Sequence, residues 1–206
     1  MNVGKNMQQR DADVFWGEIS PCEHFVQIYA DDEVFLDTLE GFIGNGLRAG
    51  DSAIVIATAA HRDALETRLL VQGIDLAEAR RNEQYIDLDA EQCLAEFIVN
   101  GWPDDDYFVA FVNGLLKRAR RSGRKVRAFG EMVALLWARG DHAATVRLEH
   151  IWQKLCQAES FSLFCAYPKS IFLDDMDDSI GHICLAHNKI VAGDVQSKTE
   201  VVYKAA

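Results

Sequence analysis

Arg127 and Glu131 are the polar residues of an otherwise apolar stretch, residues 126–137, and together they could bind a small ligand. The stretch predicts a short buried strand that Gly130 turns directly into a helix, which places both side chains near the carboxyl end of the strand. Ligands of open α/β sheets bind at that edge. The alternative is structural, because an arginine and a glutamate beside such a turn often form only a surface ion pair.

Further candidates lie at the expected ends of strands and on expected helices. Aromatic rings with a few polar groups are typical of small-molecule pockets. Trp152 and Glu149, on a predicted helix, are candidates for contact with a partner protein. Core packing is the alternative for the tryptophans, and a structural histidine is the alternative for His24. The candidate ligand-binding residues are His24, Tyr29, Arg127, Glu131, Trp137 and Tyr167.

The residue patterns of phosphate binding and nucleophilic catalysis are not found. The loop over residues 29–38 has no glycine or lysine and carries three consecutive acids, whereas a P-loop needs glycines and a lysine. No G-x-G-x-x-G or G-x-S-x-G motif occurs. Cys165 lies in an apolar strand, where burial makes a thiol unreactive, so a structural role is favoured. We therefore expect no enzymatic activity and no cofactor.

Metal binding is not predicted either. Residues 31–33 and 104–106 are acidic but lack the spacing of a calcium loop, and acids suit the starts of helices. The five cysteines are scattered without a C-x-x-C pair. His182 and His187 are five residues apart, so they do not share one side of a helix. We expect buried, reduced thiols and no metal site.

Composition limits the possible partners. The 206 residues, 49% of them hydrophobic, are enough for one domain with a full core. A net charge of -11 and a pI near 4.9 argue against direct binding to nucleic acid or to an anionic membrane. The basic run at residues 117–125 suits a helix end. No apolar run has the length of a membrane span or of a signal peptide core, so a cytoplasmic location is expected.

Strands and helices are predicted to alternate along most of the chain. Thr58, Asp89 and Asp141 are expected to cap helices, and one helix is expected to continue through Ile98. The alternation predicts the α/β class, with a mostly parallel, doubly wound sheet and helices on both faces. Strands are expected at residues 24–29, 53–57, 85–88, 126–130 and 161–167.

The two ends of the chain are expected to differ from the domain between them. Residues 1–20 are polar and irregular, which predicts a flexible lead-in. Residues 21–190 are expected to form the domain, and residues 191–206 a tail or an edge strand. The last helix of the domain is predicted from the spacing of Met176, Ile180, Ile183 and His187.

Five motifs occur in one order over about residues 22–190. They are His24-x4-Tyr29, residues 46–58, residues 127–140, Leu148-Glu149-x2-Trp152 and Phe164-Cys165-x-Tyr167-Pro168. Together they resemble the MEDS domain, the sensory domain of methanogen and methylotroph regulators, named partly for the dichloromethane-responsive repressor. The resemblance implies a RecA/KaiC-like three-layer sandwich without a P-loop. It also implies bacterial signal transduction, often beside a histidine kinase, an ATPase module or a DNA-binding helix-turn-helix.

Three functional hypotheses follow. The first is a non-enzymatic sensory or regulatory domain that binds a small ligand or a signalling protein, such as a histidine kinase or a transcription regulator. The second is an adaptor that docks on a separate kinase or regulator through the helices bearing Trp137 and Trp152. This adaptor could be a homodimer. The third is an enzyme with unrecognised groups, which would need a pocket holding two titratable residues of different pKa.

Overall fold

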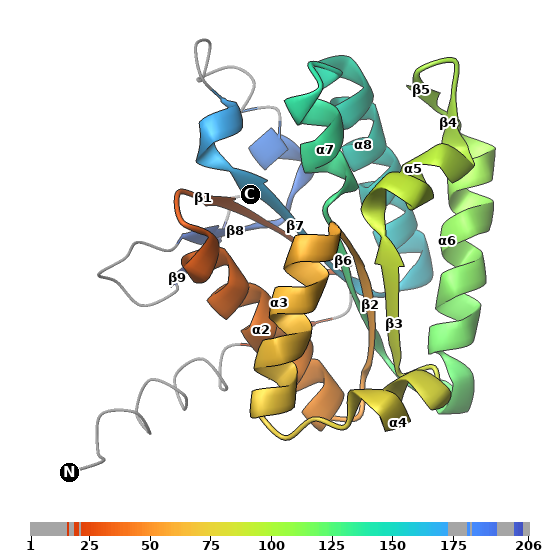
Figure 1. Cartoon of the computed structure of the whole chain (residues 1–206). Helices are drawn as coiled ribbons and strands as arrows, with labels where there is room; N and C mark the ends of the chain where they lie inside the picture. The colour runs from red at the N-terminus through yellow and green to blue at the C-terminus, as the bar shows by residue number, and fades with distance from the viewer. Residues whose placement is uncertain are drawn as a thin grey trace.

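The computed structural model of the protein describes residues 16, 19–20, 22–172, 181, 183–192 and 200–203. Within this part of the chain, no helix is long and apolar enough to cross a membrane. The elements in chain order (Figure 1) are β1 (His24–Tyr29), α2 (Asp32–Arg48), β2 (Ser52–Ala57), α3 (Ala59–Val71), α4 (Leu76–Arg81), β3 (Tyr85–Asp89), α5 (Ala90–Phe97), β4 (Ile98–Val99), β5 (Trp102–Pro103), α6 (Asp105–Ala119), β6 (Val126–Gly130), α7 (Met132–Ala138), α8 (His142–Glu159), β7 (Ser162–Pro168), β8 (Lys189–Ala192) and β9 (Glu200–Tyr203).

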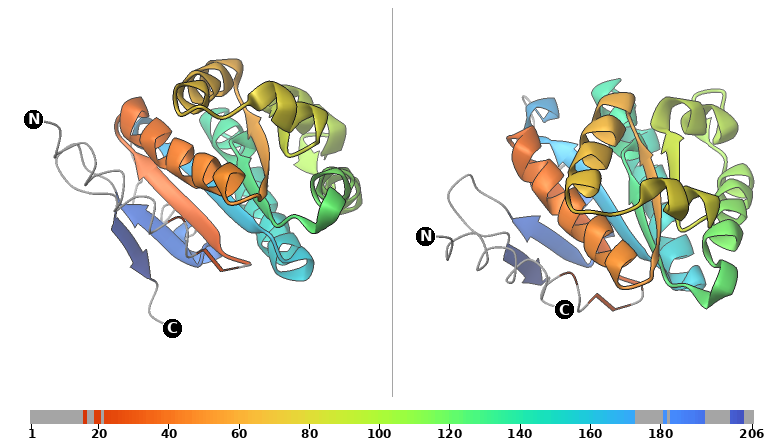
Figure 2. Two further views of the ribbon diagram at one scale, coloured as in Figure 1. Left: turned by 90° about the horizontal axis from the view of Figure 1, so that it is seen from below. Right: turned by 60° about the horizontal axis from the view of Figure 1, so that its bottom comes forward.

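A seven-stranded sheet runs through the centre of the molecule in the order β3-β2-β6-β7-β1-β8-β9. The pairs from β3 to β8 are parallel, and β9 pairs antiparallel with β8 at the edge. Helices cover both faces (Figure 2), because strands buried on both sides need an apolar layer against each. The predicted α/β class with a mostly parallel, doubly wound sheet is confirmed.

Each face of the sheet has its own core. Alternate residues of a strand point to opposite faces, so β1 contributes Phe25 to one core and Val26 to the other. Helices α2, α3 and α4 pack on the face of Phe25. Helices α5, α6, α7 and α8 pack on the face of Val26. The order of the layers is therefore helix, sheet, helix.

Local predictions about helix ends were partly right. Asp89 caps α5, since its Oδ1 accepts hydrogen bonds from the backbone N–H groups of Glu91 and Gln92. Asp141 and Thr58 precede α8 and α3 but make no capping bond through their side chains. The hydroxyl of Thr58 instead donates to Oε1 of Glu131 at 3.4 Å.

Two further differences concern chain segments. The helix expected to continue through Ile98 ends at Phe97, and Ile98–Val99 pairs with Trp102–Pro103 in a hairpin. The glycine at position 101 adopts a positive φ of 79° in this turn, which favours the hairpin over a longer helix. Strand β8 was not predicted, and it spans the boundary expected between residues 190 and 191.

The part of the expected lead-in that the structure describes packs on the domain. Trp16 is 2% exposed and lies edge-on to Phe25 and Phe42, with ring centroids 5.7 and 5.4 Å away. The final strand was foreseen as an option, because Val201–Tyr203 lies in β9. Of the predicted last helix, Ile183 lies in a helical segment and His187 follows it, whereas Met176 and Ile180 lie outside the described residues.

Candidate functional site

Glu131 connects two segments at the carboxyl ends of β2 and β6. Its Oε2 accepts a hydrogen bond from the backbone N–H of Thr58 at 2.8 Å, and its Oε1 lies 2.8 Å from Nδ1 of His61. The side chains of His61 and Glu131 are 17% and 10% exposed, so both are within reach of solvent. The carboxylate also lies at the start of α3, where the helix dipole favours a negative charge.

The topology explains why these residues meet. Strands β2 and β6 are parallel neighbours, with Ile56 paired to Gly130 near their carboxyl ends. After β2 the chain enters α3 on one face of the sheet, whereas after β6 it enters α7 on the other face. Adjacent strands whose connections diverge in this way form a topological switch point, which is where open α/β sheets bind ligands.

Aromatic side chains extend this group toward β1. The ring of Phe35 lies 5.0 Å from the ring of His61 and stacks on Tyr29 at 4.7 Å. Burial raises the pKa of Tyr29, and the carboxylates of Glu131 and Asp32 raise it further. The hydrogen bond to Glu131 raises the pKa of His61 against the opposing effect of burial. The group therefore combines a carboxylate, an imidazole with a raised affinity for a proton, and a neutral phenol.

Arg127 does not belong to this group, which corrects the prediction that it lies near the carboxyl end of its strand. It is the second residue of β6 and lies toward the amino end of the strand, because the turn at Gly130 comes three residues later. Its Nε donates to Asp51 at 3.0 Å and its Nη1 to the backbone carbonyls of Trp16 and Phe42 at 2.9 and 3.1 Å. It lines a pocket of about 420 Å³ there, but its guanidinium is committed to fixing α2 on the sheet.

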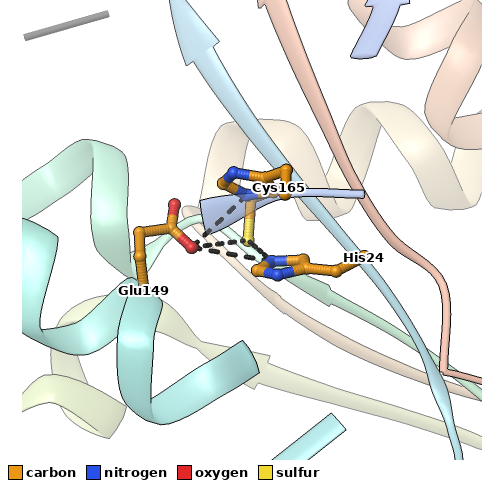
Figure 3. Close-up of side chains that lie close together, drawn as sticks. His24, Glu149 and Cys165 are labelled. Atoms are coloured by element: carbon orange, nitrogen blue, oxygen red, sulfur yellow. Dashed lines mark hydrogen bonds and ion pairs between the residues drawn. The ribbon is translucent and has the colours of Figure 1, made fainter. Parts of the chain in front are cut away.

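A second cluster is buried on the other face of the sheet. Figure 3 shows His24, Glu149 and Cys165 pointing toward one another from β1, α8 and β7. Nε2 of His24 lies 3.6 Å from Oε2 of Glu149 and 3.4 Å from Sγ of Cys165. His187 completes the cluster, with its Nε2 3.4 Å from the same Glu149 oxygen. These four residues offer atoms that bind transition metals.

Burial and mutual contact control the protonation of this cluster. Burial lowers the pKa of His24 to about 3, and the neighbouring His187 contributes to the decrease. Burial alone would raise the pKa of Glu149, but His187, His24 and the hydroxyl of Tyr167 hold it at about 2. Burial and Glu149 raise the pKa of the Cys165 thiol well above its usual value. The cluster thus holds a neutral His24, an ionised Glu149 and a protonated thiol.

The sequence of the chain matches a known protein family. A sequence profile described as MEDS, the methanogen/methylotroph, DcmR sensory domain, matches residues 23–187. The chain belongs to the MEDS family. A search of curated proteins found no match. The matched range contains both the Glu131 group and the buried cluster, and the family description supports a sensory or regulatory role for this MEDS domain.

The remaining candidate residues are buried in the MEDS domain. Tyr167 donates its hydroxyl hydrogen to Oε1 of Glu149 and so belongs to the buried cluster. Trp137 is 5% exposed and donates through Nε1 to the carbonyl of Ile171 at 3.2 Å. Trp152 and Glu149 are each 1% exposed, so the prediction that they contact a partner is not supported in this conformation. They are interior residues of α8, consistent with the core-packing alternative.

Sequence reasoning missed several residues of the MEDS domain. His61 was not singled out, although a histidine four residues after the end of a buried strand is a detectable signal. Glu149 and His187 were noticed, but their contact with His24 depends on tertiary structure, since His24 and His187 are 163 positions apart in the sequence. The expectation of no metal site considered spacing within single segments, and the four-residue cluster joins four separate segments.

Proposed function

We propose that this MEDS domain is a non-enzymatic sensor that binds a small ligand at the carboxyl ends of β2 and β6 and transmits the event to a signalling partner. The observation that carries the proposal is the position of Glu131. Its carboxylate holds the backbone of Thr58 and the ring of His61 at 2.8 Å each, across the switch point of the sheet.

The same contacts suggest how binding would be transmitted. Glu131 precedes α7, whereas Thr58 and His61 belong to the start of α3, and these helices lie on opposite faces of the sheet. A ligand that takes over the hydrogen bonds of Glu131 or His61 changes the link between the two helical layers. Such a ligand shifts a conformational equilibrium by its difference in affinity for the two states. A partner that contacts either layer then detects the shift.

The test is a titration of isotope-labelled protein followed by two-dimensional NMR of the backbone amides. The panel contains small halocarbons, small hydrocarbons, ATP and GTP with magnesium. We expect a small organic compound to shift the amide signals of Thr58, His61 and Glu131, and Glu131→Gln to weaken binding at least tenfold. Glu91→Gln is the matched control, because Glu91 is an exposed carboxylate on α5 that pairs only with Arg139 among its described contacts.

Two results would overturn the proposal. One is tight, magnesium-dependent binding of a nucleotide, which would indicate phosphate chemistry. The other is a ligand that binds with unchanged affinity to Glu131→Gln and shifts amides elsewhere in the domain.

The adaptor hypothesis needs a surface other than Trp152 and Glu149. The described residues include exposed apolar side chains near the β4–β5 hairpin, with Val99, Trp102 and Tyr107 exposed by 41%, 48% and 59%. A partner protein that receives the signal could dock there. Alanine substitution of Trp102 combined with a pull-down from cells tests this, and an unchanged set of captured proteins would exclude that surface.

A further inference from the structure

The buried cluster around Glu149 directs several electron-donating atoms at one point. His24 directs Nδ1 to Oε1 of Gln153 at 2.9 Å. The amide oxygen only accepts hydrogen bonds, so Nδ1 carries the proton of the ring and Nε2 carries a lone pair. That lone pair faces Sγ of Cys165 at 3.4 Å and Oε2 of Glu149 at 3.6 Å.

His187 is oriented in the same way. Its Nδ1 lies 2.7 Å from the backbone carbonyl of Ile183, which again only accepts, so in the neutral ring Nε2 carries a lone pair. This Nε2 is buried 3.4 Å from Oε2 of Glu149, with which it forms an ion pair when the ring is protonated, and in the neutral ring it faces no hydrogen-bond donor. An unpartnered polar atom in the interior is costly unless another group satisfies it. Two imidazole lone pairs and a carboxylate therefore converge where a positive charge is needed.

The three distances from Oε2 of Glu149 match a tetrahedral ion site. Zinc bonds of about 2.0–2.3 Å to nitrogen, oxygen and sulfur place tetrahedral ligand atoms roughly 3.3–3.8 Å from one another. The contacts of Glu149 Oε2 with His24, His187 and Cys165 measure 3.6, 3.4 and 3.7 Å. The ligand atoms of all four residues lie within 4.8 Å of one another.

The surrounding contacts are those of a metal centre as well. Metal-binding histidines donate their other ring N–H to a carbonyl or carboxylate, which fixes the tautomer. Gln153 and the carbonyl of Ile183 accept these bonds from His24 and His187. The hydroxyl of Tyr167 donates to Oε1 of Glu149, leaving Oε2 for the cluster. Each expected ligand is therefore oriented by a second group.

We propose that His24, Glu149, Cys165 and His187 bind one divalent transition-metal ion of the zinc class. Two imidazoles, a thiolate and a carboxylate are ligands of zinc and of cobalt(II), whereas magnesium and calcium prefer oxygen alone. On binding, Cys165 releases its thiol proton to solvent, and the thiolate and the carboxylate balance the charge of the ion. The metal site is separate from the Glu131 group, so the tests of the metal site do not depend on the proposed ligand site.

The first test measures metal in the full chain, purified without chelator under reducing conditions. We expect about one equivalent of zinc per chain by mass spectrometry of the metals. After removal of the metal, we expect one-to-one rebinding of zinc and cobalt(II) with micromolar or tighter affinity. The cobalt form should show a thiolate-to-cobalt band in the near ultraviolet and visible bands of four-coordinate geometry.

Variants then assign the ligands. Cys165→Ser should lose the near-ultraviolet cobalt band and bind at least tenfold more weakly. Gln153→Ala retains all four ligands, and loss of its contact with His24 should weaken binding about 10- to 100-fold. Cys156→Ser and His150→Gln are matched controls, because Cys156 is a buried thiol outside the cluster and His150 is an exposed histidine beside Glu149. Circular dichroism confirms that each variant is folded.

Two results would overturn the assignment. In the first, the wild-type chain contains no stoichiometric metal and binds neither zinc nor cobalt(II) at micromolar concentration, which would leave the cluster as a buried polar contact between side chains. In the second, Cys165→Ser keeps the near-ultraviolet band, or Cys156→Ser loses it, so that the thiolate comes from elsewhere.

Discussion

Nδ1 of His61 lies 2.8 Å from Oε1 of Glu131, and this contact joins the first turn of α3 to the residue that precedes α7. Both side chains are only slightly exposed, so solvent screens their attraction weakly. The contact raises the pKa of His61 in the folded protein. The contact is therefore stronger at low pH, where the His61 ring is protonated, than at high pH.

The first prediction concerns this pH dependence. Because the folded pKa of His61 is raised, its extra stability is fully present below the unfolded value of about 6.5 and is lost as pH rises through the folded value. Wild type should therefore be more stable than His61→Gln at low pH. Its advantage in the free energy of unfolding should be about 1 kcal/mol larger at pH 6 than at pH 8.5. Urea denaturation at several pH values measures this. His150→Gln supplies the baseline, and a difference that grows with pH would contradict the assignment.

The second prediction concerns Arg127. Its guanidinium pairs with Asp51 and donates to the carbonyls of Trp16 and Phe42, so Arg127→Met removes one buried donor from a carboxylate and from two carbonyl groups. We expect a loss of about 3 kcal/mol in the free energy of unfolding. Arg139→Met removes an exposed pair with Glu91 and should cost less than about 1 kcal/mol. Equal losses in urea denaturation would show that Arg127 does not have this role.

The third prediction concerns two helical glycines. A Cβ at Gly46 in α2 would lie 2.6 Å from Cδ and Nε of Arg127, whereas a Cβ at Gly114 in α6 would meet nothing within 4 Å. Gly46→Ala should therefore destabilise the fold by about 1–2 kcal/mol. Gly114→Ala should stabilise it by roughly 0.5–1 kcal/mol, because alanine favours a helix over glycine. Thermal melting of both variants decides, and a stabilised Gly46→Ala would contradict the close approach.

The fourth prediction concerns Trp16. Its ring is 2% exposed and packs against Phe25, Phe42 and Phe164, so Trp16→Ala should cost about 3 kcal/mol or more. Trp102→Ala is the control, because Trp102 is 48% exposed and should change stability by less than about 1 kcal/mol. Urea denaturation compares them. If Trp16→Ala were as stable as wild type, residue 16 would not be part of the folded domain.

Much of the fold could be predicted from periodicity. Apolar runs such as residues 53–57 predict strands buried on both faces, and helical spacing in residues 108–119 predicts a helix against the sheet. Strand β8 was missed because its four residues begin with a lysine and carry no alternating pattern. Pairing with β1 on one side and β9 on the other stabilises it, and sequence spacing does not report such contacts.

The candidate sites could be predicted only in part. The turn from β6 into α7 identified Glu131, because that turn is encoded locally by Gly130. Arg127 was assigned to the wrong end of the strand. The strand is so short that residues 127–130 span most of its length, which places Arg127 near the amino end and Gly130 at the carboxyl end. The cluster of His24, Glu149 and Cys165 depends on strand order and on the face to which each side chain points. Those properties arise from the packing of distant segments.

His187 is separated from Lys189, the first residue of β8, by one residue, and the Asn188 between them is bonded to the backbone of His24 through both its N–H and its side-chain oxygen. Whatever occupies the interior beside Glu149 is thus thermodynamically linked to the pairing of β8 with β1. A group bound beside Glu149 would stabilise the pairing of β8 with β1 at this side of the sheet. Separation of β8 from β1 would weaken the binding of that group by the same coupling free energy.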